Sequence, residues 1–279
     1  MFKWAIISDE ISQNLRKAIE VYQELSIPGI ELRLIEGENV VNFERKKIYE
    51  IAKMIKEAGL KVCCIASPLF KECELNDKIK YKANIELLKK TIEVAKELDT
   101  HLIRCFAFSK KGQREEKNVL DEVVKQFAEP VRIAESGGVI IAVENDLNTF
   151  AETGRELSQL LKSIGSETVR ALWDPVNAFL AGENPFSGYE KVKDLMVHLH
   201  VKDILVKGRT LEQIKFVPVG DGKINWIKQF EVLLKHGYEG YASFETSYRR
   251  REGEKAGEDA TKRSYNNCLR ILDKLSDGR

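Results

Sequence analysis

The chain alternates short apolar runs with longer segments in which apolar and charged positions are interleaved. Eight runs rich in β-branched and aromatic residues predict strands, over residues 3–8, 29–34, 61–66, 101–108, 138–144, 169–174, 196–201 and 240–245. The intervening segments place apolar residues at helical spacing, as Ile48, Ile51 and Ile55 do among Lys and Glu. They predict helices over residues 11–25, 43–59, 79–98, 115–136, 151–164, 188–194, 224–236 and 257–275.

The alternation of strand and helix predicts parallel strands joined by helical crossovers. Eight such units within 279 residues favour closure into a (β/α)8 TIM barrel, as one α/β domain spanning residues 1–279. The rival fold is an open, doubly wound sheet, which would usually have a glycine-rich turn after its first strand. Residues 8–12 contain no glycine. Long loops are expected over residues 67–78 and 202–223, on the side where a barrel carries its chemistry.

Charge and composition narrow the classes of partner. The 45 basic and 44 acidic residues give a formal net charge of +1, without the basic excess typical of nucleic-acid binding. No apolar run approaches the length of a membrane span. The five cysteines are odd in number and two are adjacent, which suits a reduced chain. With Asp9 and Glu10 too early for a signal peptide, we expect a cytoplasmic protein without nucleic-acid or membrane partners.

Four predicted strands end in a side chain that could bind a metal: Glu144, Asp174, His200 and Glu245. Their separations of 30, 26 and 45 residues each correspond to about one βα unit, so a barrel would bring them together at its C-terminal mouth. One carboxylate at a strand end is weak evidence, because many cap the next helix. Three carboxylates and an imidazole together predict a site for one divalent ion, Mn²⁺, Mg²⁺, Co²⁺ or Zn²⁺.

Motifs along nearly the whole chain carry a family resemblance. They lie at residues 29–33, 67–71, 143–145, 173–178, 198–203, 218–222 and 243–246, and the most diagnostic are His200 with the following Val-Lys-Asp and the final Phe-Glu-Thr. The chain resembles the xylose isomerase-like TIM barrel superfamily, in particular its sugar-phosphate isomerase/epimerase branch. The resemblance implies that the four residues above bind the metal and that Glu144 and Glu245 are the acid/base pair. It also allows for a homo-oligomer.

The resemblance implies an isomerase or epimerase that acts on a small sugar, keto-sugar or related polyol ketone. A metal bound to the carbonyl and the neighbouring hydroxyl would stabilise an enediolate while Glu144 and Glu245 move the proton. The same residues allow a dehydratase of a keto-polyol such as inosose. A non-catalytic binding barrel also stays open.

A remote alternative with the same fold is an abasic-site DNA endonuclease, which holds three zinc ions on many histidines. The chain has only His101, His198, His200 and His236.

Two further residues are candidates for substrate binding at the mouth. Asn177 follows Asp174 by three residues, where many members of the family have histidine, and its amide could hydrogen-bond the substrate. Lys202 shares strand parity with His200 and lies nearer the mouth, so it could contact the substrate or pair with a ligand carboxylate.

Charged residues on other strands could either bind substrate or form structural ion pairs. Glu31 and Arg104 are further candidates for substrate binding, although Glu31 with Arg33, and Arg104 similarly, could form structural ion pairs. His198 is expected to be a hydrogen-bonded core histidine. The arginines at 249–251 are expected to be a solvated charge run that could reach an anionic substrate group.

Overall fold

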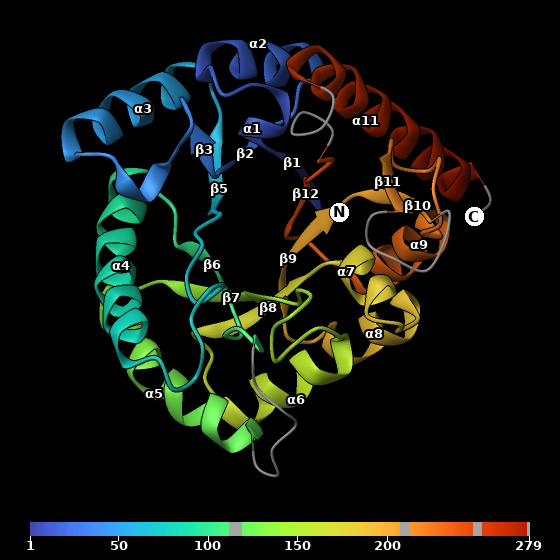
Figure 1. Ribbon diagram of the computed structural model, residues 1–279. Helices are drawn as coiled ribbons and strands as arrows, with labels where there is room; N and C mark the ends of the chain where they lie inside the picture. The colour runs from blue at the N-terminus through green and yellow to red at the C-terminus, as the bar shows by residue number, and fades with distance from the viewer. Residues whose placement is uncertain (112–118, 207–212, 248–252, 278–279) are drawn as a thin grey trace.

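Eight parallel strands close into a barrel surrounded by helices in the structure, a computed structural model that describes residues 1–111, 119–206, 213–247 and 253–277 (Figure 1). Around the barrel the order is β1-β12-β9-β8-β7-β6-β5-β2, which excludes the open sheet. The TIM barrel prediction is confirmed. The strands are β1 (Lys3–Ile7), β2 (Gly29–Leu32), β5 (Lys61–Ile65), β6 (Leu102–Phe106), β7 (Ile140–Glu144), β8 (Val169–Trp173), β9 (Met196–Val201) and β12 (Tyr241–Phe244).

Amphipathic helices cover the outside of the barrel. The α3 helix, for example, buries Ile48, Ile51 and Ile55 against it. The helix α11 lies beside α1 and α2, so the two ends of the chain complete the ring (Figure 1). The helices are α1 (Ser8–Ile11), α2 (Leu15–Leu25), α3 (Arg45–Glu57), α4 (Lys78–Glu97), α5 (Val119–Gly137), α6 (Gly154–Ile164), α7 (Pro175–Leu180), α8 (Pro185–Val192), α9 (Trp226–His236) and α11 (Glu254–Asp277), with a short 3-10 turn at Val40–Asn42. Among the described residues, no helix is long and apolar enough to cross a membrane.

The helix predictions need correction at one helix start and at two short helices that were not expected, α1 and α7. The helix expected at 188–194 begins earlier, at Pro185, because the side chain of Asn184 caps it and proline suits its first position. The helix α7 was not expected; it begins directly after β8, where Asp174 is the cap and Pro175 the first helical residue.

The predicted long loop at 202–223 contains an antiparallel pair of strands, β10 (Asp203–Val206) and β11 (Ile214–Val217), so that prediction was wrong in part. A smaller pair, β3 (Leu34–Ile35) and β4 (Glu38–Asn39), follows β2. The buried carboxylate of Asp203 fixes both ends of the 202–223 segment, because it accepts hydrogen bonds from the backbone of Ile204, Gly220, Gly222 and Ile224. A Cβ at Gly222 would collide with this carboxylate.

Buried apolar side chains form two separate clusters. The larger one lies between the strands and the helices. The smaller one includes Leu102, Ala142 and Leu172, which precede Arg104, Glu144 and Asp174 by two residues and therefore share their face of the strands. Inside the barrel, the side chains nearer the N-terminal ends of these strands are thus apolar, and those nearer the C-terminal ends are charged. The charged side chains therefore gather at the C-terminal mouth. The arginines at 249–251 lie outside the described residues.

Candidate metal centre

Four side chains converge at the mouth of the barrel. Glu144 is the last residue of β7, Asp174 and Glu245 directly follow β8 and β12, and His200 lies within β9. All four are buried, and one ligand atom from each lies within 4.8 Å of the others. The structure therefore brings together the four residues that the spacing of the strands singled out.

The imidazole of His200 is oriented towards the three carboxylates. Its Nδ1 lies 3.4 Å from Glu144 Oε1, 3.4 Å from Glu245 Oε2 and 4.0 Å from Asp174 Oδ2, and it has no hydrogen bond. Two atoms that share an ion through bonds of about 2.1 Å lie roughly 3 Å apart. These distances are close to that value. The donor set and its spacing therefore fit one divalent ion.

Glu31 contacts the Nε2 atoms of the two histidines inside the barrel, His198 and His200. Its Oε1 lies 3.2 Å from His200 Nε2 and its Oε2 lies 2.9 Å from His198 Nε2. Burial would raise the pKa of Glu31, but His200 and His198 outweigh it and hold the pKa well below its usual range. When Nε2–H of His200 donates a hydrogen bond to this carboxylate, the lone pair of the ring lies on Nδ1 and is directed at the metal centre.

Asp174 uses its two oxygens for two purposes. Oδ1 accepts hydrogen bonds from the backbone of Val176 and Asn177, both at 2.9 Å, and so caps α7. Oδ2 faces the centre, 2.6 Å from Lys202 Nζ, and burial raises the pKa of Asp174 to about 6. The side chain of Asp174 can therefore cap the helix and face a metal ion at the same time.

Lys202 lies between two of the carboxylates, because its Nζ is also 3.1 Å from Glu245 Oε2. Burial would lower the pKa of Lys202, but Asp174 and Glu245 outweigh burial and raise it. Lys202 is therefore a buried ammonium group at the centre.

Arg33 connects Glu245 to a pair of buried carboxylates that the sequence analysis missed. Its Nη1 lies 2.6 Å from Glu245 Oε1, its Nε and Nη2 bind both oxygens of Asp9 at 2.9 and 3.0 Å, and Nη2 also binds Glu10. Glu10 in turn accepts a hydrogen bond from the backbone of Ser247, beyond β12. The signal in the sequence was a pair of carboxylates directly after the first apolar strand.

Arg104 has a similar place beside Glu144. Its Nη1 lies 3.3 Å from Glu144 Oε2, and its guanidinium donates to the backbone carbonyls of Ala66 and Ser67, each at 3.3 Å. Asn177 donates to the other oxygen of Glu144, also at 3.3 Å. Each glutamate of the centre therefore has one oxygen on an arginine and the other beside His200.

Among the described residues, the buried charges at the mouth do not cancel. Six carboxylates gather there, from Asp9, Glu10, Glu31, Glu144, Asp174 and Glu245, against the cationic groups of Arg33, Arg104 and Lys202. Counted without the two histidines, these nine buried groups carry three excess negative charges. Uncompensated buried charge is costly, so a bound cation is the physical complement of this centre.

Two curated proteins align with parts of the chain. Uncharacterized protein MJ1311 of Methanocaldococcus jannaschii is 29% identical over 179 residues, which cover 61% of this chain and 59% of that protein. An inosose dehydratase of Clostridium beijerinckii is 28% identical over 124 residues, which cover 39% of this chain and 41% of that protein. The chain thus spans only about half the length of these curated relatives.

Solved structures match the barrel along almost all of its length, at low sequence identity. A D-tagatose 3-epimerase-like protein superposes with a TM-score of 0.79 at 22% identity, covering 99% of each chain. The IOLI protein, solved with a bound zinc atom, has a TM-score of 0.79 at 19% identity and covers 98% of this chain and 99% of its own. The family model described as xylose isomerase-like TIM barrel matches residues 19–268. The chain belongs to the xylose isomerase-like TIM barrel family.

Proposed function

We propose that the protein is a metal-dependent isomerase or epimerase that acts on a small sugar, keto-sugar or related polyol ketone. The observation that carries the proposal is the paired arrangement of two glutamates about His200, each with one oxygen 3.4 Å from Nδ1. Two carboxylates placed alike on either side of one centre suit a reaction in which one removes a proton and the other returns it. The resemblance of the fold to a D-tagatose 3-epimerase-like protein supports the same class.

The ion held by Glu144, Asp174, His200 and Glu245 would stabilise the negative charge that develops on the substrate oxygens. Glu144 and Glu245 would exchange the proton at the carbon next to the carbonyl. Arg104 and Arg33 hold the outer oxygen of each glutamate, so the inner oxygens stay directed at the reacting carbon. Return of the proton to the opposite face gives an epimer, and return to the neighbouring carbon gives an isomer.

The other predicted site residues divide into two groups. Asn177 and Lys202 touch the inner oxygens of the glutamates and are proposed to bind the substrate. Glu31 and Arg104 were also predicted to bind substrate, but they lie away from the inner oxygens: Glu31 contacts Nε2 of both histidines, and Arg104 contacts the outer oxygen of Glu144 and two backbone carbonyls. We therefore assign both as positioning residues.

A dehydratase of a keto-polyol is the second candidate, favoured by the identity of 28% to an inosose dehydratase. The first step would be the same removal of a proton beside the carbonyl. The outcomes differ only in whether a β-hydroxyl then leaves. An abasic-site endonuclease is disfavoured, because His101 is exposed and His236 pairs with Asp194, which leaves His198 and His200 as the histidines near the centre.

Proton exchange in D₂O tests the proposal. The protein would be loaded with Mn²⁺ or Mg²⁺ and given ketoses, their phosphates, keto-uronates and inosose, with NMR as the readout. We expect metal-dependent deuterium incorporation beside a carbonyl, lost in Glu144→Gln and kept in Glu239→Gln, whose side chain is exposed. The carbon that exchanges separates epimerase from isomerase, and loss of water identifies the dehydratase. Absence of both exchange and dehydration from every metal-loaded reaction would count against the assignment.

Glu31→Gln tests the positioning of His200. The amide can no longer accept hydrogen bonds from both histidines through two oxygens, so the Nδ1 lone pair is less firmly directed at the ion. We expect the affinity for Mn²⁺ to fall by about 10- to 100-fold, measured by isothermal titration calorimetry. Glu38→Gln, on the short strand β4, is the exposed control. Equal affinity in Glu31→Gln and wild type would remove the positioning role.

A further inference from the structure

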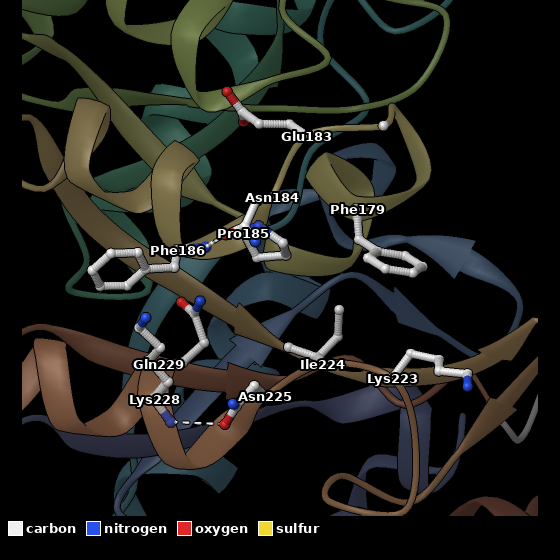
Figure 2. A pocket seen from close by; sticks show the side chains of 11 residues that line it. Phe179, Glu183, Asn184, Pro185, Phe186, Lys223, Ile224, Asn225, Lys228 and Gln229 are labelled. Carbon is white, nitrogen blue, oxygen red and sulfur yellow. Dashed lines mark hydrogen bonds between the residues drawn. The ribbon is translucent and has the colours of Figure 1, made fainter.

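A cavity lies apart from the metal centre, between α7, α8 and the start of α9. It has a volume of about 570 Å³, within the usual range for sites that bind small molecules (Figure 2). Its apolar walls come from Phe179, Pro185, Phe186 and Ile224. None of the four candidate metal ligands lines it.

The short helix α7 separates the two sites. Asn177 donates to Glu144 on the side of the metal centre, whereas Phe179 lines the cavity. Two residues along a helix are about 200° apart, so these side chains point to nearly opposite sides. A ligand in the cavity would therefore be distinct from the substrate proposed above.

The charge on the walls is positive. Lys223 and Lys228 are both exposed lining residues, and Lys228 Nζ lies 3.9 Å from the centre of the Phe186 ring. Glu183 is the one carboxylate among the lining residues, and both its oxygens accept backbone hydrogen bonds at the start of α6, from Gly154 and the next residue. Figure 2 shows its carboxylate directed away from the cavity.

Two helices also begin at this cavity. Asn184 and Asn225 line it and are the N-caps of α8 and α9. The partial positive charge of each helix start adds to that of the lysines.

Gln229 is the feature that points to a ligand. Its side chain lies on the buried face of α9, beside Trp226, Phe230 and Leu233, where the helix otherwise buries apolar or aromatic residues. The residue is 3% exposed, yet its amide group forms no hydrogen bond with any residue in the described part of the chain, and it reaches towards the cavity between Phe186 and Ile224 (Figure 2). The amide is not among the fully buried polar groups that lack a partner in the described part of the chain, so it is accessible from the cavity, where a ligand oxygen or donor would bond to it.

We propose that this cavity binds a small organic anion, a phosphate or carboxylate group carried on a sugar-sized body. The charged group lies beside Lys228, on the side of the cavity where the Gln229 amide also lies, while Lys223 is at the opposite side (Figure 2). The body packs against Phe179, Pro185 and Ile224, and one of its polar groups bonds to the amide of Gln229. The site goes beyond the proposed function and does not depend on it.

Calorimetric titration of the full chain with three probes tests the proposal: glucose 6-phosphate, glucuronate and neutral glucose. We expect saturable binding of one or both anions and none of glucose, and the phosphate and carboxylate arms tell which group the site prefers. Lys223→Gln combined with Lys228→Gln should weaken binding by roughly tenfold or more, since charged hydrogen bonds are lost. Lys235→Gln, exposed in the last turn of α9, is the matched control and should bind like wild type.

Two further variants separate this cavity from the metal centre and from effects on folding. Gln229→Leu should weaken anion binding while keeping or raising the melting temperature, because an unpartnered amide is replaced by an apolar group. Glu245→Gln should bind the anions like wild type. The proposal is overturned if neither anion binds saturably at millimolar concentrations, if the double lysine variant binds unchanged, or if binding is lost in Glu245→Gln.

Discussion

Glu245→Gln is expected to lower turnover by roughly 10²- to 10⁴-fold without unfolding the protein, the range typical of a lost acid or base. The amide has the shape of the carboxylate, and its oxygen can still accept the hydrogen bond from Arg33 Nη1. It cannot take up and return a proton at the substrate carbon. The measurement is kcat on the substrate identified by exchange, at saturating metal because Glu245 is also a candidate ligand, with the circular dichroism spectrum as the check on folding.

The exposed Glu239→Gln is the control for this variant and should keep full turnover. Unchanged kcat in Glu245→Gln would remove the residue from the acid/base role. A loss of turnover that is seen only at limiting metal and disappears at saturating metal would assign Glu245 to metal binding alone.

Arg33→Met is expected to lower the free energy of unfolding by about 3 to 5 kcal/mol, the usual cost of removing one partner from buried ion pairs. Arg33 is 4% exposed and pairs with the carboxylates of Asp9, Glu10 and Glu245, which would be left buried without this counter-charge. Urea denaturation followed by circular dichroism measures the change.

Arg16→Met changes an exposed arginine of α2 in the same way and should alter stability by no more than about 0.5 kcal/mol. Arg33→Lys keeps the charge but cannot bind Asp9 through two parallel hydrogen bonds, so its stability should lie between the other two. Equal stability of Arg33→Met and Arg16→Met would contradict the role of Arg33 in balancing these charges.

The barrel could be predicted because its strands are buried on both faces and therefore appear as nearly continuous apolar runs. The residue that ends each run, such as Glu144 or Asp174, stands out for the same reason. The four candidate ligands could thus be selected by position alone, and in the structure they lie together.

The residues that hold the four candidate ligands in place were harder to predict. Asp9 and Glu10 lie in the four-residue helix α1, and only the tertiary fold brings them to Arg33, which directly follows β2. An ion pair between residues 24 positions apart leaves no periodic signal in the sequence. Glu31 posed a related difficulty, since the sequence marked it as a candidate for substrate binding or an ion pair but could not show that both of its oxygens meet histidines.

The missed elements have local explanations. The helix α7 is six residues long, too short for apolar periodicity, and the sign of its start was the pair Asp174 and Pro175. The strands β10 and β11 have four residues each, and half of their residues are half-buried or exposed, so they lack the continuous apolar character of the barrel strands. Short elements at the mouth are therefore set by tertiary contacts more than by local sequence.

The double use of Asp174 has an evolutionary consequence. Because one oxygen begins α7 and the other faces the centre, selection for folding alone would preserve this aspartate in a descendant that had lost its chemistry. Its presence in a related barrel is then a sign of an intact helix start and not, by itself, of an active enzyme. In a barrel that had drifted towards a pseudoenzyme, Asp174 would therefore remain even where the other candidate ligands had been replaced.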